Sequence, residues 1–289
     1  MKLAARRRLA SLAVLAPPLA WTCLFMIVPY AIMLSYSFFR KEGFAFVPDF
    51  QFGNYLTLLL DPQYSQVLLR TLKIALMVSL AALVLAYPLA YFLVFKVRSP
   101  RFRLFLYMAV IVPLWVSYLL RAYTWKTILG SEGVLNSFLI WSGLLDEPTP
   151  LLLYNQFSMV LTLTYIFIPF MVMPIYTALE KIPASLIEAS GDLGVGPLRT
   201  FLRITLPLSV PGILAGMTFT FCLSFGDFIA PFLVGGPSGT MVANIVQAQF
   251  GIAFNWPLGA AISIVMLAIV IAIISVSDRF ERAGRLDLG

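Results

Sequence analysis

Six long segments without charged residues constrain the fold of this chain most strongly. They contain no lysine, arginine, aspartate or glutamate, and they are residues 9–39, 74–95, 104–120, 148–179, 204–226 and 228–277. A helix needs about 20 apolar residues to cross the hydrocarbon core of a membrane. Only 11% of the 289 residues are charged, whereas soluble domains are about 25% charged. The chain is therefore expected to span a membrane several times.

Helices are the expected spanning structure. In lipid, only helices and closed barrels satisfy the backbone, and these segments are continuously apolar, without the alternation of a barrel strand. We predict an all-α polytopic membrane protein with six transmembrane helices in residues 9–278, between tails at 1–8 and 279–289. The predicted spans lie near residues 11–38, 72–95, 104–124, 157–179, 209–232 and 258–277. The first is expected to be retained, because its uncharged run is longer than the core of about 7–15 residues in a signal peptide.

The basic residues predict the orientation, because lysine and arginine gather on the cytoplasmic side. Of the 20 basic residues, 14 lie in the two tails and in the loops 96–103 and 181–203, all on one predicted side. The remaining six lie on the other side: Arg40, Lys41, Arg70, Lys73, Arg121 and Lys126. Both termini are therefore predicted to be cytoplasmic, with Arg40 and Lys41 as exceptions to the rule. The net charge of +7 reflects this bias and does not indicate a nucleic-acid site.

The composition argues against several chemistries. The chain has no histidine, which excludes histidine-based nucleophilic catalysis and imidazole metal ligands. Its two cysteines, Cys23 and Cys222, lie inside predicted spans and are expected to be small packing residues. A phosphate-binding loop of the G-x-x-x-x-G-K-S/T type does not occur. We therefore expect no catalytic residues, no metal site and no cofactor, and any use of ATP must take place on another chain.

A charged segment with turn residues follows the fourth predicted span. Between Glu188 and Pro207 it reads E-A-S-G-D-L-G-V-G-P-L-R-T-F-L-R-I-T-L-P. Pro183 and Pro197 suit the first turns of two short helices, and the glycines between these helices permit a sharp turn. Leu206 and Pro207 are expected to end the second helix before the fifth span. The alternative interpretation of this segment is an ordinary amphipathic loop that lies on the membrane surface.

The same segment resembles a family signature: E-A-A, three residues, G, nine residues and I-x-L-P, with Ser190 replacing the second alanine. This is the signature of bacterial ABC importer permeases. The chain resembles type I permeases of the spermidine/putrescine class, in particular the first of their two permease subunits. Further similar segments are Arg70–Leu72, Tyr87–Phe92, Val112–Trp115, Arg121–Trp125, Leu153–Asn155, Phe170–Pro174, Gly226–Phe228, Gly235–Gly236 and Asn255–Gly259. Related permeases for iron, opines and other solutes share several of these segments.

The resemblance implies a set of partners and a location. It implies a multi-pass protein of the bacterial cytoplasmic (inner) membrane, surrounded by lipid and without a nucleic-acid partner. It also implies a second homologous permease, two cytoplasmic ATPase subunits and a periplasmic or extracellular solute-binding protein. Residues 180–207 are then the loop that couples to the ATPase. The loop residues that match the signature are Glu188, Ala189, Ser190, Gly194, Ile204, Leu206 and Pro207.

Asp227 is the candidate for contact with the solute. It separates two uncharged runs, and an ionisable residue inside a span is a functional candidate. Its carboxylate would attract a cationic polyamine. Alternatively, it pairs with a basic residue such as Arg70 or Arg121, or it bonds to backbone freed by Pro231.

Aromatic residues of the third span are weaker candidates for the pathway. Trp115 and Tyr118 would contact an ammonium through cation–π attraction, or they belong to an interfacial aromatic belt. Six spans and Asp227 would also fit a channel or an ion-coupled secondary transporter. The coupling signature argues against that class, because such proteins do not need an ATPase.

Overall fold

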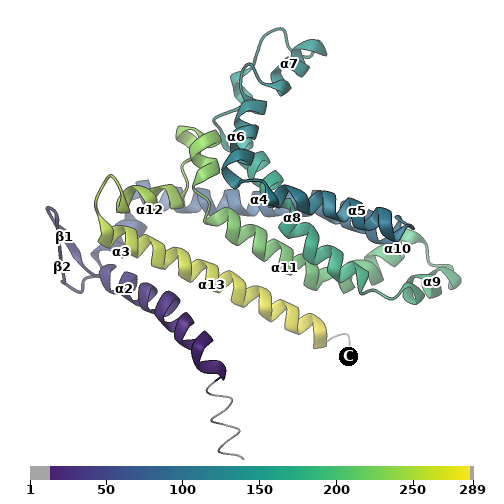
Figure 1. Cartoon of the computed structure of the whole chain (residues 1–289), viewed down its shortest axis with the longest axis horizontal. Coiled ribbons are helices and arrows are strands. Elements are labelled where there is room, and N and C mark those ends of the chain that lie inside the picture. The colour runs from purple at the N-terminus through teal and green to yellow at the C-terminus, as the bar shows by residue number, and fades with distance from the viewer. Residues whose placement is uncertain (1–13, 287–289) are drawn as a thin grey trace, which may run out of the picture. The chain divides into compact units, whose positions relative to one another are not determined.

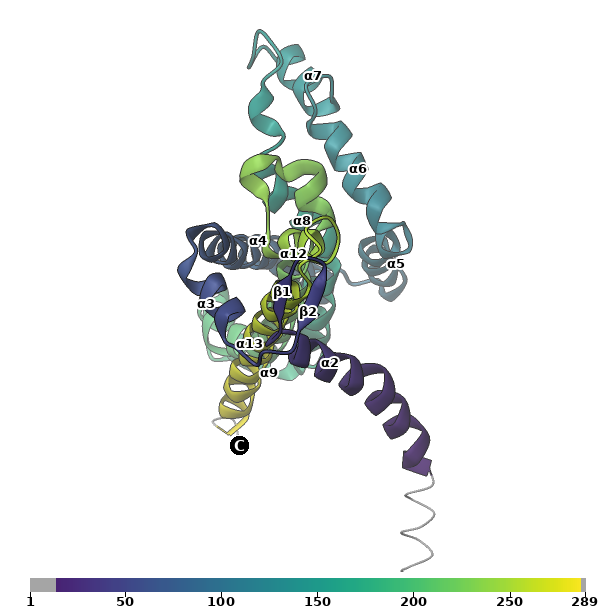
Figure 2. The same ribbon diagram turned by 90° about the vertical axis from the view of Figure 1, so that its left-hand side faces the viewer.

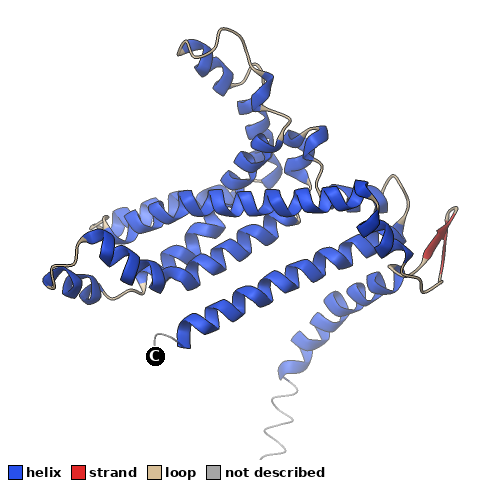
Figure 3. Ribbon diagram, turned by 180° about the vertical axis from the view of Figure 1, so that it is seen from behind, coloured by secondary structure: helices blue, strands red, loops and turns tan. Residues whose placement is uncertain are grey.

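The computed structural model describes residues 14–286 and the side chains of residues 14–280. The described chain consists of helices joined by short loops, with one two-stranded hairpin (Figures 1 and 3). It divides into two compact units. One contains the residues up to Tyr64 together with Val246–Ala268, and the other contains Ser65–Ile245 and the residues from Ile269 onward. The predicted tail at residues 1–8 lies outside the described residues.

The membrane spans agree with the predicted number. Five described helices are long and apolar enough to cross a membrane: Val14–Tyr36, Pro62–Phe95, Gln156–Glu180, Pro197–Phe225 and Trp256–Phe280. A sixth span is obtained if the bent helix pair Pro100–Trp115 and Tyr118–Trp141 is counted as one. The all-α prediction is confirmed, with a short hairpin that the sequence analysis did not predict.

The first unit contains the N-terminal span and the loop that follows it. The span has a π-helical segment, η1 (Cys23–Ile27), before α2 (Val28–Tyr36), and none of its side chains from Val14 to Tyr36 is buried. After it come β1 (Arg40–Glu42), β2 (Ala45–Val47) and α3 (Gly53–Leu60). Most of α12 (Val242–Phe250) and the beginning of α13 (Trp256–Leu286) complete this unit.

The hairpin holds the two basic residues that are exceptions to the charge rule. β1 and β2 pair antiparallel, with Lys41 opposite Phe46 (Figure 2). Arg40 contacts Glu42 at 2.6 Å and Asp49 at 3.6 Å, and Lys41 donates to the carbonyl of Ala253 at 2.7 Å. Both cations therefore have partners within their own unit.

The second unit contains the remaining elements. In chain order they are α4 (Pro62–Phe95), α5 (Pro100–Ile111), η2 (Val112–Trp115), α6 (Tyr118–Leu129), α7 (Val134–Trp141), η3 (Pro150–Leu152), α8 (Gln156–Glu180), α9 (Ala184–Asp192), α10 (Pro197–Thr200), η4 (Phe201–Thr205), α11 (Leu206–Phe225), η5 (Pro231–Gly235) and η6 (Pro237–Gly239). The most apolar window of α8 is 61% buried, more than that of any other span described. α8 is therefore the central helix of this unit.

Small residues allow the helices next to α8 to approach it closely. On α4, Ala82, Ala86 and Ala90 are fully buried in the same cluster as residues of α8. On α11, a Cβ at Gly212 would lie 2.6 Å from the carbonyl oxygen of Pro174, and one at Gly216 would lie 2.7 Å from the sulfur of Met171. Small residues four apart are typical of close helix packing in membranes, where shape complementarity replaces the hydrophobic effect.

The third predicted span, 104–124, is wrong as a continuous helix. The chain bends by 97° between Trp115 and Tyr118, where Val116 and Ser117 adopt extended backbone angles. Pro113 precedes the break within the short 3₁₀ segment η2, and its ring removes one backbone donor from the helical ladder.

Two predicted boundaries near the fifth span are also wrong. Leu206 and Pro207 do not end a helix, because Pro197–Phe225 is one continuous helix. The π-helical segment η4 lies directly before Pro207, and the Leu206 N–H bonds to the carbonyl of Phe201, so the wider turn accommodates the proline. At the other end, the helix stops at Phe225 and not at residue 232, because the chain turns at Gly226.

Candidate functional site

The loop between α8 and α11 contains the two short helices that the sequence predicts. Pro183 caps α9, and Pro197 is the first residue of α10. Between these helices, the Val195 N–H bonds to the carbonyl of Ser190 and the Gly194 N–H to that of Gly191. This is a Schellman motif, in which the residue after the helix adopts the left-handed conformation. Gly194 supplies that residue, with φ +72°.

Gly194 is required by the backbone and not by crowding. A Cβ built on Gly194 meets no atom within 4 Å, so space alone would admit a larger residue. Its positive φ is the constraint, because most side chains disfavour that conformation.

A buried hydroxyl pair joins the two helices of the loop. Ser190 Oγ and Thr200 Oγ1 lie 2.6 Å apart, and their residues are only 6% and 8% exposed. Sequence reasoning treated Ser190 as a small replacement for alanine and missed this bond. A bond between residues ten positions apart becomes apparent only when α9 and α10 are folded against each other.

The loop exposes an apolar surface beside its acidic residue. Glu188, Ala189 and Gly194 are exposed, while Ile204 and Leu206 are half-buried and Pro207 is exposed. The loop also exposes leucines, namely Leu193 at 82%, Leu198 at 69%, Leu202 at 52% and Leu186 at 44%. The signature residues therefore divide between an exposed turn and the root of the long helix. Exposed leucines around a turn are typical of a surface that another protein covers.

A small cavity lies at the base of this loop. Its volume is about 290 Å³, and it is lined by Val94, Phe95, Arg103, Glu180, Ile182, Ala184, Ile187 and Glu188. Glu188 thus stands between the exposed turn and a recess that holds charges of both signs.

Asp227 lies where α11 ends. One carboxylate oxygen, Oδ1, accepts from the Ala230 N–H at 2.9 Å and so caps the short helical segment that leads into η5. The other oxygen, Oδ2, accepts from the hydroxyl of Tyr118. Tyr118 begins α6 just after the bend at residues 116–117. The carboxylate of Asp227 therefore connects the end of α11 to the start of α6, two places where a helix is interrupted.

The structure distinguishes among the alternatives for Asp227. Arg70 donates to the carbonyl of Ser238 at 2.9 Å, and within the described side chains Asp227 forms no ion pair closer than 4.0 Å with Arg70 or Arg121. The backbone alternative is present, through Ala230. Tyr118 joins Asp227, but Trp115, before the bend, is 85% exposed.

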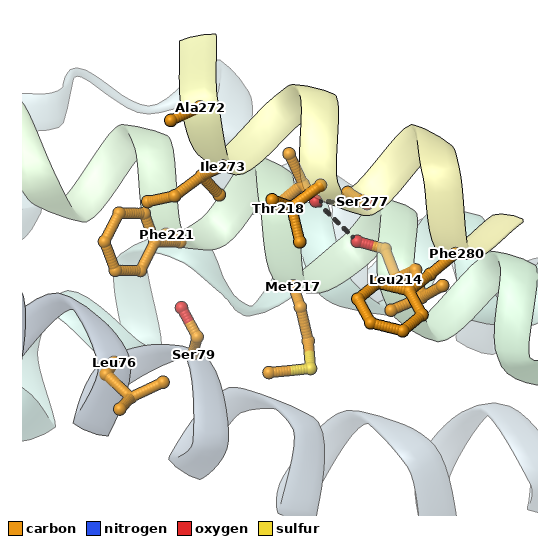
Figure 4. Close-up of a pocket in the computed structure, with 11 residues that line it drawn as sticks. Leu76, Ser79, Leu214, Met217, Thr218, Phe221, Ala272, Ile273, Ser277 and Phe280 are labelled. Atoms are coloured by element: carbon orange, nitrogen blue, oxygen red, sulfur yellow. Dashed lines mark hydrogen bonds between the residues drawn. The ribbon is translucent and has the colours of Figure 1, made fainter. Parts of the chain in front are cut away.

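Two larger cavities lie along the helices of the second unit. One, of about 880 Å³, runs along α8 and α11 and includes Phe170, Met173, Pro174, Lys181, Phe219 and Leu223 in its lining. The other, of about 430 Å³, lies between α4, α11 and α13 (Figure 4). In the latter, the hydroxyls of Thr218 and Ser277 are 2.9 Å apart, and most of the remaining lining is apolar. Neither cavity is lined by Asp227, Tyr118 or Trp115.

Known proteins resemble this chain over most of its length. The Spermidine/putrescine transport system permease protein PotB of Escherichia coli K12 is 39% identical over 92% of this chain and 94% of its own length. The Inner membrane ABC transporter permease protein YdcU of the same organism is 35% identical over 91% and 88%.

The fold resembles that of a solved ABC transporter. A chain of the bacterial alginate ABC transporter, solved in complex with an alginate pentasaccharide-bound periplasmic protein, matches with a TM-score of 0.79 and 19% identity over 96% of both chains. The family model described as "Binding-protein-dependent transport system inner membrane component" matches residues 78–283, which include the coupling signature, Tyr118 and Asp227. The chain therefore belongs to the family of binding-protein-dependent transport system inner membrane components.

Proposed function

We propose that this chain is the transmembrane permease subunit of an ATP-driven importer whose solute is a polyamine such as spermidine or putrescine. The similarity to PotB, at 39% identity over 92% of the chain, carries this proposal. It extends through the loops as well as the spans, so it is more than a shared hydropathy pattern.

Within this importer, α9 and α10 form the contact with a cytoplasmic ATPase. The exposed turn at Gly194 and the neighbouring leucines supply the surface, and Glu188 supplies its charge. The helix Pro197–Phe225 is continuous, so a displacement of the loop is transmitted along α11. Gly212 and Gly216 pack closely against α8, so the displacement also reaches this central helix of the unit.

The remaining parts of the importer are other chains. Two ATPase subunits hydrolyse ATP, and the permease itself is not catalytic. A second homologous permease completes the pathway, and a solute-binding protein delivers the solute on the periplasmic or extracellular side. The proposal includes cytoplasmic termini, as the basic residues predict, and this orientation puts the loop 180–207 on the ATPase side.

The charge at Asp227 supports a cationic solute. Its carboxylate is half-buried, and a negative charge attracts an ammonium more strongly in a region of reduced dielectric than in water. Tyr118 adds an aromatic ring beside it. Trp115, exposed before the bend, remains a candidate for the pathway, with an interfacial aromatic belt as the alternative. An importer for iron, opines or another small organic solute is the alternative within the same class.

Uptake into vesicles tests this function. The chain is reconstituted with the second permease, the ATPase and the solute-binding protein of its importer, and labelled putrescine and spermidine are offered. We expect saturable uptake that requires both ATP and the binding protein. Uptake by this chain alone, driven by an ion gradient, would contradict the proposal and indicate a secondary transporter. Uptake of an iron complex or an opine, with no uptake of polyamine, would reassign the solute.

A further inference from the structure

Arg121 is a buried cation without a matching anion at contact distance. It is 8% exposed, and its Nη1 donates to the carbonyl of Ile166 at 3.2 Å. Its Nε has no hydrogen-bond partner. A neutral carbonyl does not cancel a full charge, and burying an uncancelled charge costs stability. A hydrophobic residue would pack here at lower cost, so the charge itself is expected to have a use.

Tyr118 connects this cation to Asp227. The guanidinium carbon of Arg121 lies 5.8 Å from the centre of the Tyr118 ring, and the hydroxyl of the same ring donates to Asp227. The ring is further fixed by Phe167, at 6.2 Å between centroids. The positive charge is thus held one aromatic ring away from the carboxylate and does not form an ion pair with it.

The separation between Arg121 and Asp227 matters because the carboxylate must release the solute after binding it. A carboxylate has about four acceptor positions, and Tyr118 and Ala230 donate to one oxygen each, so an ammonium can still bind. In a region of reduced dielectric, an unopposed carboxylate would hold that ammonium strongly. Transport requires attraction strong enough for entry and weak enough for exit.

We infer that Arg121 determines how tightly the pathway holds a cationic solute, by opposing the attraction of Asp227 from behind Tyr118. This inference rests on the proposed function, and it concerns a residue that does not itself touch the solute.

A purely structural role for Arg121 is the competing explanation. Its bond to Ile166 joins α6 to α8, so its loss would loosen that contact whatever the charge of the solute. The two roles differ in their dependence on the charge at position 121. An electrostatic role is kept when lysine supplies the charge and is lost when the side chain is neutral, whereas a structural role of the guanidinium is disturbed by both changes.

Charge variants of Arg121 in the assembled complex separate them, and Asp227→Asn shows whether the two charges act independently on the solute. Arg121→Gln removes the charge and keeps hydrogen-bond donors, and Arg121→Lys keeps the charge. Both are made with Asp227 intact and with Asp227→Asn. Lys126→Gln is the matched control, because it removes one positive charge from the same helix, where Lys126 lies over the rings of Tyr123 and Tyr154. The dissociation constant of labelled putrescine is measured on the permease–ATPase complex in nanodiscs without binding protein, alongside uptake turnover and thermal stability.

We expect Arg121→Gln to bind putrescine at least about fivefold more tightly, the lower end of the usual coupling between linked sites, and to turn over more slowly. Arg121→Lys and Lys126→Gln should bind as the wild type does. In the Asp227→Asn background overall binding should be weaker, but Arg121→Gln should still tighten it, because the repulsion between Arg121 and the ammonium adds to the attraction of Asp227 and does not act through it. Unchanged binding by Arg121→Gln, or an equal change by Arg121→Gln and Arg121→Lys, would overturn the inference. If Arg121→Gln does not assemble, Arg121→Lys alone tests the inference. A dissociation constant of Arg121→Lys that differs from that of the wild type in both backgrounds would then overturn the inference. A wild-type complex that takes up no polyamine would overturn the proposed function together with this inference.

Discussion

At the scale of single residues, the charge of Asp227 is the most direct test of the pathway. Asp227→Asn keeps the size of the side chain and an oxygen that can accept from Ala230, and the Tyr118 hydroxyl can accept from the new amide. The cap and the contact between the helix breaks are therefore retained, and only the charge is lost. Hydrogen bonds to charged groups contribute about 1.5–3 kcal/mol, so polyamine uptake per assembled complex should fall at least about tenfold.

The measurement is uptake normalised to the amount of assembled complex, with ATP hydrolysis in the absence of solute as the control. That basal hydrolysis should stay close to the wild-type value. If Asp227 acts only as a helix cap, Asp227→Asn will lower expression or thermal stability, and uptake per complex will not change.

Gly194 allows a test of the coupling loop through backbone conformation alone. Its φ of +72° and the empty space around its Cα mean that a substitution is penalised by backbone strain without a clash. Asparagine tolerates the left-handed region, whereas a β-branched residue there is strained by about 1–3 kcal/mol. Gly194→Val should therefore strongly reduce solute-stimulated ATP hydrolysis, and Gly194→Asn should reduce it much less.

The control for this comparison is Gly191→Ala, in the same loop. Gly191 lies inside α9 without a positive φ and without close neighbours, so alanine should be neutral or slightly stabilising there. Equal activity of Gly194→Val and Gly194→Asn would show that the Schellman turn is not what the ATPase recognises.

At the scale of the helices, the contact between α8 and α11 depends on two glycines that differ in their neighbours. A Cβ on Gly212 would meet backbone at the Pro174 carbonyl, 2.6 Å away, whereas one on Gly216 would first meet the flexible end of Met171. Overpacking costs about 1–3 kcal/mol when the neighbours cannot move. Gly212→Ala should lower the thermal stability of the purified permease more than Gly216→Ala does. The reverse order would mean that the two helices separate easily at Gly212.

The sequence predicted those elements that depend on local composition. Uncharged length predicted the spans, and the prolines and glycines predicted α9, its turn and α10. Where the chain departs from these predictions, tertiary contacts decide. Pro207 was predicted to end a helix, but the π-helical turn η4 accommodates it. Pro113 lies in the apolar run 104–120, but a proline does not by itself predict a bend, since Pro169 and Pro174 lie inside the continuous helix α8. The contact of Tyr118 with Asp227 joins residues 109 positions apart, so no local pattern reveals it.

At the scale of the whole molecule, orientation in the membrane decides which surface meets the ATPase. The basic residues predict that the loops 96–103 and 181–203 lie on the cytoplasmic side. The exceptions, Arg40 and Lys41, already have partners in and near the hairpin, so they carry less free charge to oppose this orientation. The cytoplasmic assignment of both termini is therefore retained as a prediction.

Two single cysteines test it in a background where Cys23 and Cys222 are replaced. Phe44 is 88% exposed near the turn of the hairpin, and Ser99 is exposed in the loop before α5. A membrane-impermeant maleimide should label Phe44→Cys in intact right-side-out vesicles, and should label Ser99→Cys only after the membrane is permeabilised. Because the two positions lie on opposite predicted sides, each serves as the control for the other. Labelling of Ser99→Cys alone from outside would reverse the orientation and move the loop 180–207 away from the ATPase, which would remove the basis for coupling through α9 and α10.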